Sequence, residues 1–149
     1  DIAALTALTK LFLPSFIARG SGRILNVSSI ASLVPGPWQA TYFAAKAYVT
    51  SLTLALSEEL RGTGVTATVV LPGGMRTGFE VAAKLEGTGL AAQLTQSPDD
   101  VARRSYEAML RGRRKLIAGT PLLQRLLLRL VPFAPTTFVL RVVARLHKR

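Results

Sequence analysis

The first part of the chain alternates between helix-like and strand-like spacing of its apolar residues. Over residues 1–19 apolar side chains recur at intervals of three and four and form one helical face: Leu5, Leu8, Phe12 and Phe16. This spacing predicts a helix that Gly20 ends. The run RILNVSS at residues 23–29 follows and is bounded by Gly22 and a pair of serines. It predicts a short buried strand.

The same alternation continues along the chain. Residues 30–41 contain two prolines and a glycine, which predicts an irregular segment, and residues 42–61 form the next predicted helix. A run rich in β-branched residues at 64–74 predicts a second strand, broken at Pro72-Gly73.

A third helix and a third strand complete the pattern. Ser97 is a suitable N-cap, Pro98 suits the first helical position, and the two aspartates that follow face the positive end of the helix dipole. We expect this helix to run to about Arg111. The run KLIAG at residues 115–119 predicts the third strand.

Helices that alternate with strands imply crossover connections and a parallel sheet covered on both faces. We therefore predict an α/β fold with a doubly wound, Rossmann-like parallel sheet over residues 1–119. Three strands are few, and the strand at 23–29 would form an open edge. We expect the sheet to be incomplete, with further strands supplied by a missing N-terminal part.

Residues 120–149 differ in kind and predict a basic amphipathic helical extension. Arg125 and Arg129 lie one turn apart, and Arg141 and Arg145 repeat this spacing. Five leucines line the other side of the first segment: Leu122, Leu123, Leu126, Leu127 and Leu130. The longest run without charge is shorter than the ~20 residues that span a bilayer. Such helices either lie in a membrane interface or dock on the body of the protein or on another subunit.

The charge of the chain is concentrated in this extension. The 149 residues carry 19 Lys or Arg and 8 Asp or Glu, yet residues 111–149 hold ten of the basic residues and none of the acidic ones. The high net charge is thus a property of the tail, and we predict no nucleic-acid binding from it. The chain has no cysteine and a single histidine, so we predict no metal site and no disulfide.

Candidate chemistry gathers at the carboxyl ends of the predicted strands, where open α/β sheets bind ligands. Ser29 ends the first strand, Tyr42 begins the next helix, and Lys46 lies one turn further on the same face. A cation beside a phenol favours the phenolate, which can exchange a proton with a carbonyl or alcohol oxygen. Alone, this spacing is weak, because a tyrosine that packs its ring and a lysine that reaches solvent would look the same.

The stretch from Gly22 to Thr77 resembles the short-chain dehydrogenase/reductase family. In that family a serine precedes the catalytic tyrosine by thirteen residues, as Ser29 precedes Tyr42 here. The resemblance implies that Tyr42 is the general acid and base, that Lys46 tunes it and contacts the cofactor ribose, and that Ser29 holds the substrate oxygen. Ser28 and Asn26 are then expected to be structural.

The resemblance also implies an NAD(P) cofactor, with NADP preferred over NAD. Its binding residues would be Tyr42 and Lys46 together with Pro72, Gly73, Met75 and Thr77. Val34 would border the substrate pocket, and Phe79 would either contact the substrate or close the core. Trp38 would either border the pocket or simply pack against its loop. The implied protein is a cytoplasmic homo-oligomer that transfers hydride to or from a carbonyl or alcohol substrate, which we expect to be apolar.

Two features depart from the family pattern. The glycine-rich turn that binds the cofactor pyrophosphate is absent, so the N-terminal dinucleotide-binding βαβ unit is expected to be missing. This piece alone is expected to bind the dinucleotide poorly and to be inactive. Asp1 stands where the family has an asparagine. The alternative function is therefore a truncated, non-catalytic domain that acts in binding or assembly.

Overall fold

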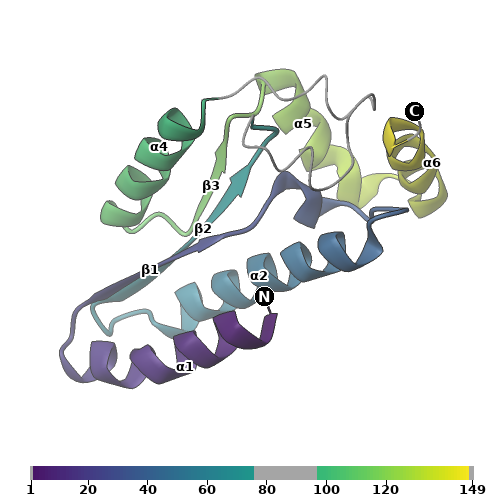
Figure 1. Ribbon diagram of the computed structural model, residues 1–149. Coiled ribbons are helices and arrows are strands. Elements are labelled where there is room, and N and C mark those ends of the chain that lie inside the picture. The colour runs from purple at the N-terminus through teal and green to yellow at the C-terminus, as the bar shows by residue number, and fades with distance from the viewer. Residues whose placement is uncertain (1, 76–96, 148–149) are drawn as a thin grey trace.

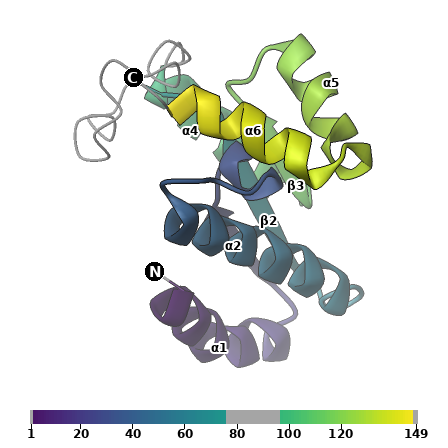
Figure 2. The same ribbon diagram turned by 90° about the vertical axis from the view of Figure 1, so that its right-hand side faces the viewer.

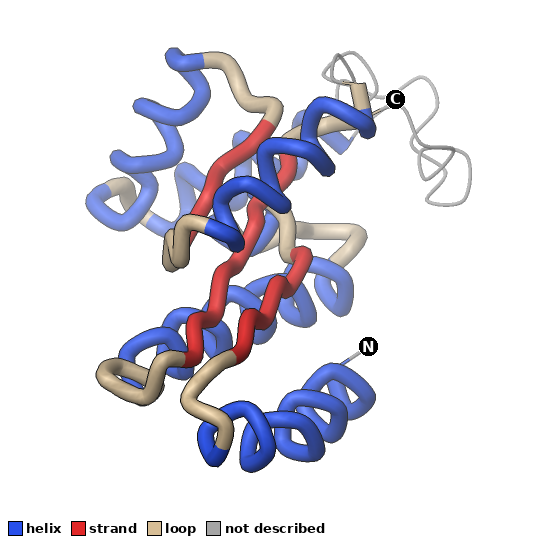
Figure 3. Tube along the Cα trace, turned by 90° about the vertical axis from the view of Figure 1, so that its left-hand side faces the viewer, coloured by secondary structure: helices blue, strands red, loops and turns tan. Residues whose placement is uncertain are grey.

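The three predicted strands form one parallel sheet. The computed structural model describes residues 2–75 and 97–147. In it β1 (Gly22–Val27), β2 (Val65–Pro72) and β3 (Lys115–Ala118) lie side by side in the order β1-β2-β3 (Figure 1 and Figure 3). Val27 pairs with Val70, and Val69 pairs with Lys115. The predicted Rossmann-like α/β fold class is confirmed.

Helices cover both faces of the sheet. Helices α1 (Ile2–Ala18) and α2 (Ala40–Glu59) lie on one face, and α4 (Pro98–Leu110) lies on the other (Figure 1). Strand β2 is buried along nearly its whole length because it is central. Val65 and Ala67 pack toward α1 and α2, whereas Val70 packs with Val101 of α4. Alternate residues of β2 therefore serve opposite faces, as the strand period requires.

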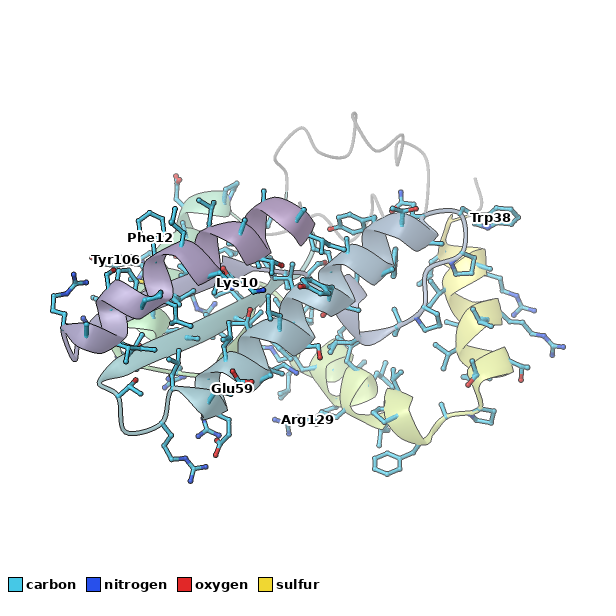
Figure 4. All side chains as sticks on the ribbon, turned by 90° about the horizontal axis from the view of Figure 1, so that it is seen from below. Lys10, Phe12, Trp38, Glu59, Tyr106 and Arg129 are labelled. Atoms are coloured by element: carbon cyan, nitrogen blue, oxygen red, sulfur yellow. The ribbon has the colours of Figure 1, made fainter. Side chains whose placement is uncertain are left out.

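Helix α1 buries only part of the apolar face that the spacing defines. Phe16 packs against the core together with Leu13, but Leu8 and Phe12 are exposed (Figure 4). Apolar residues occur on nearly every side of this helix, including the exposed Leu11. The spacing therefore predicted the helix but did not identify its buried side.

Two element boundaries also differ from the predicted ones. Strand β1 ends at Val27, so Ser29 lies beyond the strand and caps a 3-10 helix, η1 (Ile30–Leu33). Helix α2 begins at Ala40, which places Tyr42 in its first turn. At the start of α4, Ser97 occupies the N-cap position and Pro98 the first turn, but the Ser97 side chain makes no capping hydrogen bond.

The C-terminal extension forms two helices joined by a short 3-10 turn. These are α5 (Leu122–Leu130), η3 (Val131–Phe133) and α6 (Thr136–His147), which lie beyond the carboxyl ends of the strands (Figure 2). Val139 and Val143 of α6 are buried with Phe43 of α2. Among the residues that the structure describes, none belongs to a helix long and apolar enough to cross a bilayer.

Candidate active site

Ser29 lies just past the end of β1, where its backbone is extended and leads into η1. Its Oγ accepts a hydrogen bond from the Ala31 backbone N–H at 3.1 Å. The Ser29 carbonyl oxygen accepts from the Ser32 hydroxyl at 2.7 Å. The first bond uses a lone pair of Ser29 Oγ and leaves its hydroxyl proton to donate. Ser29 is thus a fixed, half-buried hydroxyl at the sheet edge.

Lys46 ties α2 to the end of the same strand. Its Nζ donates a hydrogen bond to the Val27 carbonyl oxygen at 3.2 Å. The same Nζ lies 5.8 Å from the centroid of the Tyr42 ring. Lys46 is half-buried, and this loss of solvation lowers its pKa from the ordinary value of 10.5. The structure therefore brings the predicted cation and phenol together at the end of β1.

The ring of Tyr42 is held by an apolar cluster. It meets the Phe43 ring edge-on, with 5.9 Å between centroids and 79° between planes. Tyr42 also packs against the buried group formed by Phe43, Val139 and Val143. Tyr42 therefore lies beside a cluster that joins α2 to α6, two distant parts of the chain.

A network of hydroxyls beneath Lys46 joins β1, η1 and α2. The buried Ser28 donates from Oγ to the Lys46 carbonyl at 2.8 Å and lies 2.7 Å from Thr50 Oγ1. Thr50 Oγ1 in turn donates to Ser32 Oγ at 2.9 Å. The Ser28 backbone N–H donates to the Val70 carbonyl at 2.8 Å. These bonds suit the structural role expected of Ser28.

Thr50 and Ser32 are members of this network that were not predicted from the sequence. Thr50 lies eight residues after Tyr42 and four after Lys46, so all three share one helix face. That spacing was the sequence signal by which Thr50 could have been predicted. Asn26 makes a similar link deeper in the core, where its Nδ2 donates to Thr53 Oγ1 at 2.9 Å.

The end of β2 is closely packed around Gly73. Its N–H donates to the Ala118 carbonyl at 2.8 Å. A Cβ at this position would lie 2.6 Å from the Gly119 carbonyl oxygen and 2.9 Å from Thr120 Oγ1. Only glycine fits here without a shift of the backbone. The end of β2 therefore presents main-chain atoms rather than a side chain. Met75 follows and packs its side chain against the core near Val70.

The predicted pocket residues are only partly brought together. Val34 lines an open cleft of about 520 Å³ between the segment after η1, the outer side of α2 and Leu140 of α6. Ser29, Tyr42 and Lys46 do not line it. Trp38 is 76% exposed and projects from the end of the molecule near α6 (Figure 4), and it does not line this cleft. Asp1, Thr77 and Phe79 lie outside the described residues.

Known proteins match both the sequence and the fold. The ketoacyl reductase HetN of Nostoc sp. strain PCC 7120 is 34% identical over 142 residues, which cover 92% of this chain and 49% of the relative. A solved short-chain dehydrogenase from Sphingobium yanoikuyae in complex with NADPH is 26% identical, with a TM-score of 0.72 over 83% of this chain and 48% of that one.

A solved 7beta-hydroxysteroid dehydrogenase shares the fold at 22% identity, with a TM-score of 0.77 over 95% of this chain and 55% of that one. The chain thus spans about half the length of the relatives that it matches. Residues 1–86 match the family model described as short chain dehydrogenase. This match covers more than half of the sequence, and the chain belongs to the short-chain dehydrogenase family.

Proposed function

We propose that this chain carries the proton-transfer site of an NAD(P)-dependent oxidoreductase that interconverts a carbonyl and an alcohol. The observation that carries the proposal is the position of Lys46. Its Nζ is bonded to the Val27 carbonyl at 3.2 Å and lies 5.8 Å from the centroid of the Tyr42 ring. A half-buried cation held beside a phenol at the carboxyl edge of a parallel sheet suits acid and base catalysis.

Each residue has a distinct role in the proposed reaction. The Tyr42 hydroxyl gives its proton to the substrate oxygen during reduction and takes one back during oxidation. The Lys46 ammonium stabilises the phenolate that remains after proton donation. The Ser29 hydroxyl donates a hydrogen bond to the same substrate oxygen and so orients the carbonyl.

The residues at the ends of β1 and β2 fit the nicotinamide end of a dinucleotide. Lys46 offers a fixed cation and donor at one strand end, and Gly73 at the next presents backbone with no side chain in the way. We assign Tyr42, Lys46, Pro72, Gly73 and Met75 to this end, together with Thr77 from the sequence pattern. The bound cofactor would supply the hydride. The related dehydrogenase in complex with NADPH favours NADP over NAD.

The substrate, assembly and location form a second part of the proposal. The relative HetN is a ketoacyl reductase, which supports an apolar carbonyl compound as substrate. We assign Val34, Trp38 and Phe79 to the substrate side. The protein would act in the cytoplasm as a homo-oligomer, with residues 120–149 in peripheral contact with a membrane surface.

Substitution of the tyrosine tests the proposed reaction in the protein expressed from its complete gene. NADPH and NADH oxidation would be followed with a panel of short and long-chain ketones. We expect Tyr42→Phe, which keeps the ring, to lower turnover on the order of 10²–10⁴-fold. Tyr106→Phe removes an exposed hydroxyl on α4 and should leave turnover unchanged. Equal turnover in wild type and Tyr42→Phe would overturn the assigned role.

A further inference from the structure

The leucine side of α5 faces away from the rest of the protein. Its five leucines are between 47% and 73% exposed: Leu122, Leu123, Leu126, Leu127 and Leu130. Gln124, Arg125 and Leu128 are half-buried instead, and Arg125 Nε is fully shielded from solvent. At 100° per residue these three lie on the opposite side of the helix from the leucines. An amphipathic helix is therefore docked with its apolar side outward.

Exposed apolar side chains continue from α5 into the 3-10 turn that follows it. None of the residues of α5 is buried. Phe133, which follows in η3, is 86% exposed. Five exposed leucines followed by an exposed aromatic residue are an unusual concentration of apolar side chains for a surface that meets only water. We define the α5 face as the five leucines together with Phe133.

The charges around the α5 face select the partner. Residues 120–149 carry six Lys or Arg and no acid. Arg129, Arg141 and Arg145 are exposed on α5 and α6. A second copy of this chain would bring the same positive charge to a symmetric contact, which opposes pairing through this face. An anionic lipid surface offers both an apolar layer and negative headgroups.

We infer that the α5 face inserts into the interface of an anionic membrane, with the neighbouring arginines at the lipid headgroups. The inference deepens the peripheral contact proposed above by naming the face and the lipid charge, and it does not require the oxidoreductase activity. Helix α5 has nine residues and so lies in the interface rather than across it. It begins four residues after β3 ends, at the carboxyl edge of the sheet (Figure 2). The lipid surface would therefore lie at the same edge of the sheet as the proposed proton-transfer site.

Vesicle flotation of the protein expressed from its complete gene tests the inference without substrate or cofactor. The vesicles would be pure phosphatidylcholine or a mixture with phosphatidylglycerol. We expect the wild type to float with the anionic vesicles, less so at high salt, and the double variant Leu126→Gln/Leu127→Gln to bind at least about tenfold more weakly. The matched control is Leu11→Gln, which changes an exposed leucine of α1 and should bind as the wild type does.

The other outcomes contradict the inference in distinguishable ways. Equal flotation of the wild type and the double variant would leave membrane contact in place but would show that the α5 face is not its site. An absence of flotation for the wild type would refute the membrane contact itself. If sedimentation without lipid shows that the double variant dissociates an oligomer, then the face is a protein interface and the inference fails. NADPH oxidation measured on the same samples reports separately on the proposed reaction.

Discussion

Lys46 donates a hydrogen bond from Nζ to the carbonyl oxygen of Val27 at 3.2 Å, and so a half-buried cation is fixed at the end of β1. Burial of an ammonium group away from solvent costs free energy, which is why the pKa of Lys46 is lowered. The charged form of Lys46 therefore costs the folded protein some stability, which the proposed role of this residue in catalysis would explain.

The first prediction concerns the folding free energy that burial of the Lys46 ammonium costs. We expect Lys46→Met to unfold at the same or a higher urea concentration than wild type at pH 7, while the proposed turnover falls on the order of 10²-fold. At a pH between the lowered pKa of Lys46 in the folded protein and its ordinary value of 10.5, Lys46 is protonated in the unfolded chain but not in the folded protein. The stability of the wild type therefore rises with pH in that range. The advantage of the variant should therefore shrink toward pH 10. A variant less stable than wild type at every pH would contradict this account.

The second prediction concerns the network of hydroxyls beneath Lys46. Ser28→Ala removes the donor to the Lys46 carbonyl and one partner of Thr50. We expect the free energy of unfolding to fall by about 1–2 kcal/mol, because the Lys46 carbonyl and the Thr50 hydroxyl each lose a hydrogen-bond partner where water does not readily replace it. Ser57→Ala is the matched control, since Ser57 Oγ bonds only within its own helix, to the Leu54 carbonyl. Equal losses in the two variants, measured by urea unfolding, would show that the network adds nothing.

The third prediction concerns Gly73. An alanine there would place Cβ 2.6 Å from the Gly119 carbonyl oxygen, and the ends of β2 and β3 would have to separate. We expect Gly73→Ala to cost about 2–3 kcal/mol of folding free energy and to raise the KM for NADPH. Gly62→Ala is the comparison: a Cβ there meets open space, but its φ of 82° costs about 1 kcal/mol. A Gly73→Ala protein as stable as the Gly62→Ala protein would contradict the packing argument.

The sequence predicted the elements better than it predicted their contacts. Alternating helices and strands indicate a parallel sheet with little ambiguity, because few other folds accommodate that order. Lys46 also lies beside the Tyr42 ring, as their spacing of four residues on one helix predicts. Local spacing carries both features, so they are readable from the chain.

The spacing of residues along the sequence does not predict contacts between distant segments. The bond between Ser28 and Thr50, and the packing of Tyr42 near Val139, depend on how α2 and α6 dock on the sheet edge. The outward orientation of the α5 leucines was also left open, since an amphipathic pattern says which side is apolar but not what that side faces. Only the structure could decide these points.

The last prediction tests whether α6 positions the tyrosine. Val143 is buried against Phe43, and Tyr42 packs on the same cluster. Val143→Ala removes two methyl groups from this contact, so we expect a loss of about 1.5–2 kcal/mol in folding free energy. Val142→Ala is the matched control, because its side chain is exposed on the same helix and should cost under about 0.5 kcal/mol.

Kinetics separate packing from positioning in this pair of variants. If α6 holds the Tyr42 ring in place, Val143→Ala should lower kcat with the assayed ketone, at temperatures where the protein remains folded, because a misplaced proton donor reacts more slowly. Val142→Ala should leave kcat unchanged. A Val143→Ala protein that is destabilised but turns over at the wild-type rate would show that α6 stabilises the fold without setting the position of Tyr42.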